Sequence, residues 1–114
     1  MTIYLDHAAT TPLRREVLDA MLPVFESGWG NPGSSHAVGR AAREILDDAR
    51  ARLAKRLGAE AREIVFTSGG SEADNLAIKG AAWAGKAHGH RIVTTSIEHH
   101  AVGHTVRYLE KFGF

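Results

Sequence analysis

A short apolar segment followed by a glycine-rich turn limits the folds that are open to this sequence. Residues 64–67 are apolar and partly β-branched, as in a buried strand, and residues 68–71 place two glycines between serines. A helix-like pattern follows over 74–84. A strand that ends in such a turn and opens a helix presents backbone N–H groups at the positive end of the helix dipole. The sequence therefore predicts a pocket for an anion, with a phosphate-bearing ligand as the first candidate.

The same turn has a simpler interpretation, in which the glycines serve only the shape of a helix cap. Glycine-rich turns are common, and neither the Walker pattern nor Gly-x-Gly-x-x-Gly is present in the sequence. Taken alone, the turn leaves the phosphate site and the plain helix cap equally open.

Strands and helices are expected to alternate over the second half of the chain. After the first strand and its helix, a second strand is expected at 91–96 and another helix over 99–112. This order predicts parallel strands with right-handed crossovers, and hence an α/β fold. In an open parallel sheet, ligands gather beyond the carboxyl ends of the strands, so the polar turns at 68–71 and 96–99 can face one crevice.

Two helices are expected before the first strand. Residues 14–27 carry a helical apolar pattern, but Pro23 lies inside it, so a kink or an early end is expected. The next helix is expected to start at a cap on Ser34 or Ser35 and to end at Gly58.

The patterns also predict which helix faces are buried. In the long helix Asp48 pairs with Arg52 on the solvent side, and the apolar face consists of Val38, Ala42, Ile45, Ala49, Leu53 and Leu57. The helix over 74–84 has a face of small residues suited to packing on a sheet, namely Leu76, Ala77, Gly80, Ala81 and Ala84. In the last helix the inward side chains are expected to be Val102, Val106 and Leu109, with Phe112 as a further candidate.

Composition excludes several classes of function. The 114 residues fit one domain, and 14 basic against 13 acidic residues give no support to nucleic-acid binding or to an anionic membrane surface. Without a long apolar run or a signal-like start, a soluble cytoplasmic protein is expected. With no cysteine, this chain offers no disulfide or thiol chemistry.

A helix that stops at Gly113 leads us to expect a chain cut at an element boundary, with further sequence elsewhere.

Histidines and lysines give mostly negative indications. His100 and His104 would share a helix face, but without cysteine or a His-Glu-x-x-His motif no metal site is predicted. None of the four lysines looks like an activated amine, because Lys55, Lys79, Lys86 and Lys111 fall in or after helices. His99 differs by its position just past a strand end, where an imidazole can stack on a flat ring, shuttle a proton, or simply start the helix.

Four motifs in the same order resemble those of the cysteine desulfurases. Residues 4–12 resemble the opening segment of that family, and residues 30–36 its Gly-Asn-Pro loop. Residues 66–75 are similar to its phosphate-binding turn, and residues 98–102 to the segment with its ring-stacking histidine. Class V aminotransferases and selenocysteine lyases share part of this pattern, but the opening segment favours the desulfurases.

The resemblance implies a pyridoxal 5′-phosphate enzyme of the aspartate-aminotransferase-like fold, usually a homodimer. Residues 1–14 would belong to the small domain and residues 15–114 to the start of the large cofactor-binding domain. Gly70 and Ser71 would hold the cofactor phosphate through backbone N–H groups and the Ser71 hydroxyl. His99 would stack on the pyridine ring and assist proton transfers.

The family reaction converts L-cysteine to L-alanine and leaves the sulfur as a persulfide on the enzyme. That sulfur then goes to an acceptor such as an iron–sulfur scaffold protein, or to tRNA thiolation. The family's cofactor-binding lysine, the aspartate on the pyridine nitrogen and the persulfide cysteine all come later in the chain and have no counterpart here. The chain by itself is therefore expected to be inactive.

Two departures and several alternatives remain. His7 stands where the family often has Asn, and Gly70-Ser71 replaces the commoner Ala-Thr while keeping a hydroxyl. The alternatives are another class V enzyme, a non-catalytic α/β module that binds a phosphorylated ligand, and a fragment that pairs with a complementary chain. The sequence assigns no role to Asp6, His7, Asn31 or His36, and it does not distinguish cysteine from selenocysteine or identify the sulfur acceptor.

Overall fold

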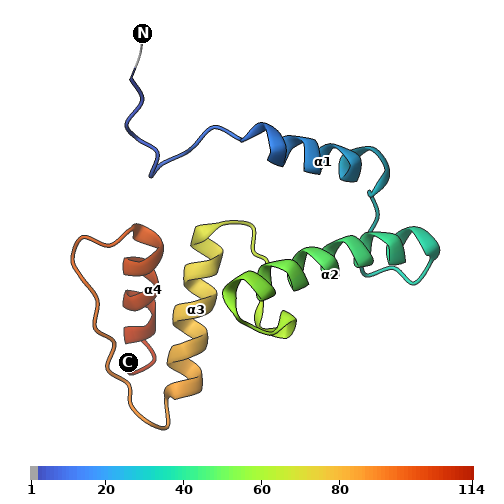
Figure 1. The fold of residues 1–114 in the computed structure, drawn as a ribbon. Helices are drawn as coiled ribbons and strands as arrows, with labels where there is room; N and C mark the ends of the chain where they lie inside the picture. The colour runs from blue at the N-terminus through green and yellow to red at the C-terminus, as the bar shows by residue number, and fades with distance from the viewer. Residues whose placement is uncertain (1–2) are drawn as a thin grey trace. The chain divides into compact units, whose positions relative to one another are not determined.

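The structure of this chain, a computed structural model, describes residues 3–114. Over that range the chain forms α1 (Arg15–Ser27), α2 (Ala37–Leu57), α3 (Gly70–Gly85) and α4 (His100–Glu110), with a short 3-10 helix, η1 (Ala61–Glu63), after α2 (Figure 1). The chain divides into two compact units, one ending at Ile64 and one covering residues 65–114. The first unit holds α1, α2 and η1, and the second holds α3 and α4.

No β-strand forms within residues 3–114. The segments 64–67 and 91–96, for which the sequence predicts parallel strands, are irregular chain, so the structure does not confirm the α/β fold. A strand is held by backbone hydrogen bonds to a neighbouring strand, which an apolar pattern by itself does not supply. Val65 and Val93 accordingly leave 63% and 87% of their surface exposed.

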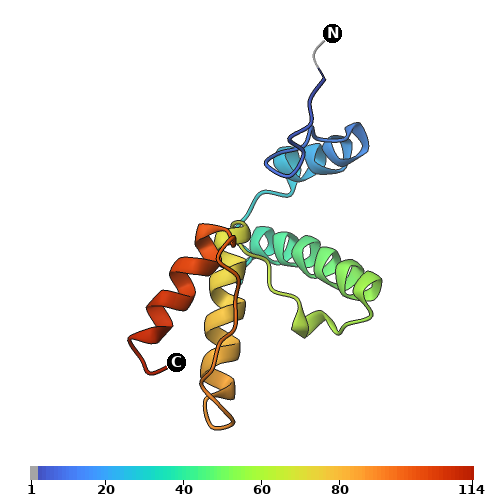
Figure 2. The same ribbon diagram turned by 90° about the vertical axis from the view of Figure 1, so that its left-hand side faces the viewer.

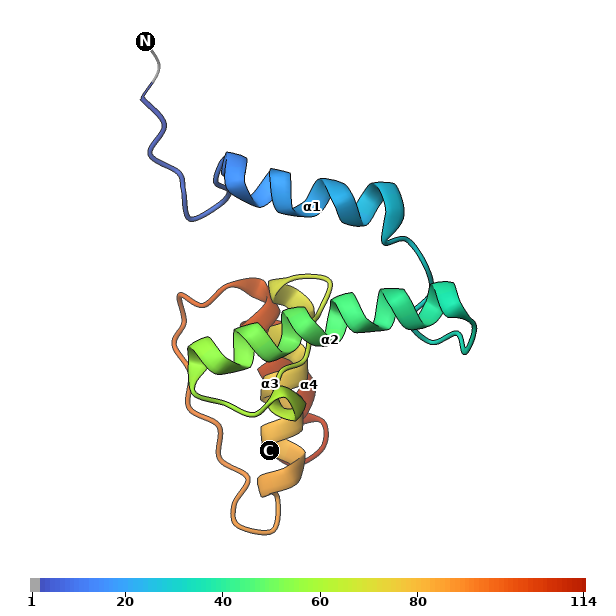
Figure 3. The same ribbon diagram turned by 45° about the vertical axis from the view of Figure 1, so that its right-hand side comes forward.

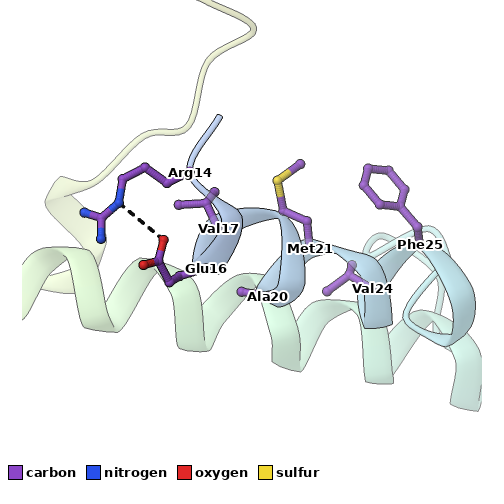
Figure 4. A pocket seen from close by; sticks show the side chains of 7 residues that line it. All are labelled: Arg14, Glu16, Val17, Ala20, Met21, Val24 and Phe25. Atoms are coloured by element: carbon purple, nitrogen blue, oxygen red, sulfur yellow. Dashed lines mark ion pairs between the residues drawn. The ribbon is translucent and has the colours of Figure 1, made fainter. Parts of the chain in front are cut away.

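α1 runs past its internal proline. The helix continues through Pro23 to Ser27, so the early end that the sequence allows does not occur. Pro23 lies close to the end of the helix, where its missing N–H removes a single backbone bond, and the Ser27 hydroxyl donates to its carbonyl at 3.0 Å. An open, mostly apolar hollow of about 610 Å³ lies along one side of α1. Arg14 and Glu16, which form an ion pair, also line it (Figure 4).

α2 begins at a histidine and ends at a left-handed glycine. The Nδ1 atom of His36 accepts the backbone N–H of Gly39 at 3.3 Å, so the predicted cap on Ser34 or Ser35 is wrong. Gly58 ends the helix as predicted, with φ at +67° and its N–H bonded to the Ala54 carbonyl.

Side chains along α2 follow the predicted pattern only in part. Ala42 and Ala54 are buried, but the large apolar members of the predicted face, Val38, Ile45, Leu53 and Leu57, remain exposed. The predicted ion pair between Asp48 and Arg52 is confirmed. The apolar face is therefore correctly located in sequence but largely uncovered by the residues that the structure describes.

α3 and α4 pack against each other in the second unit, and they lie side by side in Figure 1, Figure 2 and Figure 3. Leu109 is fully buried between them, which confirms it as an inward residue, while Val102 and Val106 are half-buried. α3 starts at Gly70, four positions before the predicted start. The predicted small-residue face of α3 is exposed rather than packed on a sheet.

Aromatic rings and one lysine pack together at the C-terminal end of α3. The Trp83 ring meets the rings of Phe112 and Phe114 edge-on, with centroids 5.5 and 5.2 Å apart. Lys86 donates to the Phe112 carbonyl at 3.1 Å and lies over the rings of Trp83 and Phe114. These contacts tie the end of α3 to the turn that follows α4.

Replacing Gly58 with Ala tests the end of α2. An L-residue at φ +67° carries a steric cost, so we expect the Gly58→Ala variant of the full-length protein to lose about 1 kcal/mol of unfolding free energy. Denaturant unfolding measures this loss. Gly58→Asn is the matched control, because Asn tolerates the left-handed region, and it should recover part of the stability. Equal stability of all three proteins would contradict the left-handed cap.

Candidate functional site

The turn before α3 is closed by a carboxylate from the first turn of the helix. One oxygen of Glu72, Oε2, accepts both the backbone N–H and the hydroxyl of Ser68, each at 2.7 Å. The Thr67 hydroxyl donates to the carbonyl of Gly69 at 3.2 Å. Hydrogen bonds from Ser68, the hydroxyl first and the backbone second, hold the pKa of the Glu72 carboxyl below its usual value.

The start of α3 keeps its backbone donors open. Gly69 precedes the helix without a side-chain cap, and the first helical bond runs from the Ala73 N–H to the Gly69 carbonyl at 3.1 Å. The N–H groups of Gly70, Ser71 and Glu72 therefore have no partner within the helix. A side chain at Gly69 or Gly70 would meet no atom within 4 Å, and Gly69 is extended, with φ at 166°. Local shape does not require these glycines, but their small size leaves the N–H groups accessible.

A hollow of about 400 Å³ lies along α3 and α4, next to this helix start. It brings Ser71 and His99 together, two of the three residues that the sequence singles out, and Gly70 adjoins Ser71 in the chain. The full lining is Ser71, Asn75, Lys79, His99, His100, Ala101, His104, Thr105 and Tyr108. This lining holds a lysine and three imidazoles and no carboxylate, so its chemistry suits an anionic ligand.

His99 starts α4 and also lines the hollow. Its Nδ1 atom accepts the Ala101 N–H at 3.1 Å, so the interpretation of His99 as a helix start is confirmed. Because Nδ1 accepts this bond, the ring carries its proton on Nε2. The cap thus fixes the ring without using its second nitrogen. The ring centroid lies 5.9 Å from that of His100, which in turn lies 5.4 Å from His104.

Sequence reasoning missed three residues around this site. Asn75 donates to the Ser71 carbonyl at 2.9 Å, and the Lys79 ammonium lies 4.7 Å from the centre of the Tyr108 ring. Both line the hollow, although the sequence analysis gives Lys79 no role because it falls within a helix. The spacing of Ser71, Asn75 and Lys79 at four-residue steps is the signal that places them on one helix face. Glu72, the third, follows Ser68 at the same spacing.

Residues of the other motifs have local structural roles in the first unit. The Tyr4 hydroxyl donates to the carbonyls of Asp6 and Thr10 at 2.9 and 3.2 Å, and the rings of Tyr4 and His7 meet edge-on. The side-chain oxygen of Asn31 accepts the Gly33 N–H at 2.8 Å. Together with the helix cap that His36 provides, these contacts give His7, Asn31 and His36 a local structural role, and Asp6 takes part through its backbone carbonyl.

The residues that the structure describes offer neither a metal centre nor a membrane-spanning helix. No three histidine or carboxylate side chains in this range come together as a metal site. No helix in this range combines the length and apolar character that a membrane span requires.

Comparison with known proteins identifies the family. Residues 3–113 match the model of the class-V aminotransferases. The chain belongs to this family. It is 56% identical over 112 residues to a Bacillus subtilis (strain 168) protein named "Putative cysteine desulfurase IscS 1", a match covering 98% of this chain and 30% of the relative. It is 51% identical over 112 residues to the cysteine desulfurases IscS of Dictyoglomus turgidum (strain DSM 6724 / Z-1310) and Methanosarcina thermophila, covering 98% of this chain and 28% of each relative.

These matches confirm the resemblance drawn from the four motifs. Membership of the class-V aminotransferases makes the fold family that of pyridoxal-phosphate enzymes. The chain spans less than a third of the length of the relatives that it matches. Activity, substrate and partners therefore belong to the proposals below.

The two hydrogen bonds from Ser68 to Glu72, here called the clamp, predict how the Glu72 carboxyl group titrates. Since hydrogen bonding lowers the carboxyl pKa in the folded protein, its stabilising effect is present at neutral pH and is lost as the pH falls through the folded-state pKa. Ser68→Ala removes the hydroxyl donor and should raise the pKa of Glu72 toward its ordinary value. A carbon-detected NMR titration of the carboxyl group measures the shift. Ser71→Ala, which removes a hydroxyl outside the clamp, should leave the midpoint unchanged, and an unchanged midpoint in Ser68→Ala would contradict the clamp.

Proposed function

We propose that the full-length protein is a pyridoxal 5′-phosphate-dependent cysteine desulfurase. The observation that carries this proposal is the identity of 51–56% to proteins named cysteine desulfurases over 98% of the chain. The joint presence of Ser71 and His99 on one carboxylate-free hollow supports it independently. No observation on this chain favours a selenocysteine lyase, an aminotransferase or a non-catalytic module.

In this proposal the start of α3 binds the phosphate of the cofactor. The N–H groups of Gly70 and Ser71 and the Ser71 hydroxyl are donors of the kind that a phosphate needs, and the open space at Gly70 allows close approach. His99 lies on the same hollow, where its ring can stack on the pyridine ring. When bound, the cofactor supplies the electron sink for chemistry at the substrate's α carbon.

The residues of this chain orient and exchange protons rather than attack the substrate. His99 holds a proton on Nε2 while its Nδ1 atom stays bonded to the helix, so the ring can move a proton without losing its place. In the overall reaction the C–S bond of L-cysteine breaks, the carbon takes up a proton, and the sulfur joins an enzyme thiol as a persulfide. That thiol is not in this chain, which contains no cysteine. The chain alone is proposed to be inactive.

The remaining features of the proposal follow the family. Residues 1–14 are assigned to the small domain and residues 15–114 to the start of the large domain of a cytoplasmic homodimer. In that α/β domain, segments 64–67 and 91–96 would become parallel strands once neighbouring strands satisfy their backbone groups. The exposed small-residue face of α3 is suited to pack on such a sheet. The sulfur would pass to an acceptor such as an iron–sulfur scaffold protein.

The activity test uses the purified full-length protein with pyridoxal 5′-phosphate. Incubation with L-cysteine and a thiol reductant should release L-alanine and sulfide in equal amounts. L-selenocysteine and an amino-group acceptor, assayed in parallel, test the other class V activities. Turnover of either with no alanine from L-cysteine would overturn the assignment.

Substitution of His99 separates its two proposed roles. His99→Ala should lower turnover by about 100-fold or more, as expected for a proton-transferring group, while some cofactor remains bound. His99→Phe keeps a flat ring without the nitrogen, so it should retain more cofactor than His99→Ala without restoring turnover. Steady-state kinetics and cofactor absorbance give the two readouts. Unchanged turnover in His99→Ala would refute the role of His99.

A further inference from the structure

We propose that Glu72 is a positioning residue that holds the 68–71 turn in the form that binds the cofactor phosphate. This inference rests on the proposed function, since it concerns the same phosphate site. Glu72 is not among the residues that line the hollow, so it would act through Ser68 and not by touching the ligand.

The Glu72 carboxylate and the two Ser68 donors that it binds form a clamp across the 68–71 turn. Oε2 of Glu72 takes two donors from the one residue that precedes the two glycines, and both bonds are 2.7 Å long. Hydrogen bonds to an ionised carboxylate are stronger than those between neutral groups. The bonds join the two ends of the turn, so Gly69, Gly70 and Ser71 are enclosed between Ser68 and Glu72.

Side-chain packing does not restrain the two glycines of this turn. A side chain at Gly69 or Gly70 would find no atom within 4 Å, so packing does not fix the glycines, and no side-chain cap holds Gly69. Glycine is also the residue with the greatest backbone freedom. The Gly69 carbonyl accepts bonds from the Thr67 hydroxyl and the Ala73 N–H, and Asn75 donates to the Ser71 carbonyl, while the clamp is the restraint that ties Ser68 to the helix start.

The direction of the Glu72 carboxylate also matters because of its charge. A carboxylate in the first turn of a helix would ordinarily compete with a phosphate for the same positive end of the helix dipole. Glu72 instead directs its oxygen to Ser68, where two donors offset its charge. The N–H groups at the start of α3 are left for the ligand, so the clamp orders the turn without occupying the site.

The test compares ligands that differ only in the phosphate. Pyridoxine 5′-phosphate and pyridoxine lack the aldehyde, so their affinities for the cofactor-free full-length protein report binding without a covalent bond. We expect Glu72→Ala to weaken the affinity for pyridoxine 5′-phosphate by about tenfold, the effect of losing a charge-assisted pair. The affinity for pyridoxine should change by less than about twofold. Glu72→Gln, which keeps an acceptor without the charge, and Ser68→Ala, which keeps one of two donors, should fall in between. Glu44→Ala, on an exposed part of α2, is the control and should match the wild type.

The outcomes separate the two proposals. If Glu72→Ala weakens the affinities for both ligands equally, Glu72 only supports the fold. If neither affinity weakens, the turn keeps its shape without Glu72. Either result overturns the positioning role. Should Glu72→Ala fail to fold, Glu72→Gln and Ser68→Ala decide by the same comparison. If the wild type binds both ligands equally well, the phosphate site itself fails, and the positioning role with it. A preference for the phosphorylated ligand that survives in every variant overturns only the inference about Glu72.

Discussion

Packing of α3 against α4 is the contact on which the candidate site depends. Leu109 and Thr105 are the buried residues of this interface, and the Thr105 hydroxyl is satisfied by the Ala101 carbonyl at 2.7 Å. With the helices side by side, the four-residue series from Ser71 to Lys79 on α3 faces the polar side of α4. The hollow is thus a product of helix packing, and its chemistry comes from the facing sides of α3 and α4 together with His99 just before α4.

The helices, and where they end, could largely be predicted from local sequence. Gly58 and the pairing of Asp48 with Arg52 depend on neighbouring residues in the chain, so their prediction succeeded. The caps were harder, because serine is the usual cap and the sequence offers two serines just before His36. A histidine takes that role through its Nδ1 atom at the start of both α2 and α4. Neither cap depends on a residue far away in sequence, so both could be recognised in other chains of this family.

The strands and the buried faces could not be predicted from the same local rules. A strand depends on hydrogen bonds to another segment, and the predicted faces of α2 and α3 need apolar surface to cover them. Within residues 3–114 those partners are absent, and Val93 and Ile97 remain among the most exposed large apolar side chains. For the site, position in the sequence identified Ser71 and His99. Glu72, Asn75 and Lys79 follow Ser68 and Ser71 at four-residue steps, but that spacing becomes informative once the start of α3 and its hydrogen bonds are known.

The cluster around Lys86 has a consequence for chemical modification of this chain. The Lys86 ammonium group donates to the Phe112 carbonyl and lies over two aromatic rings. These contacts are at the end of α3 that lies farthest from Ser71. Acetylation of Lys86 would remove the charge that makes these contacts favourable. With the helix rising about 1.5 Å per residue, the distance from Ser71 to Lys86 is about 22 Å, well beyond direct electrostatic contact at physiological salt. Acetylation confined to Lys86 would thus loosen the aromatic end of the helix pair, whereas a general acylating reagent would also remove the charge of Lys79 in the anion-binding hollow.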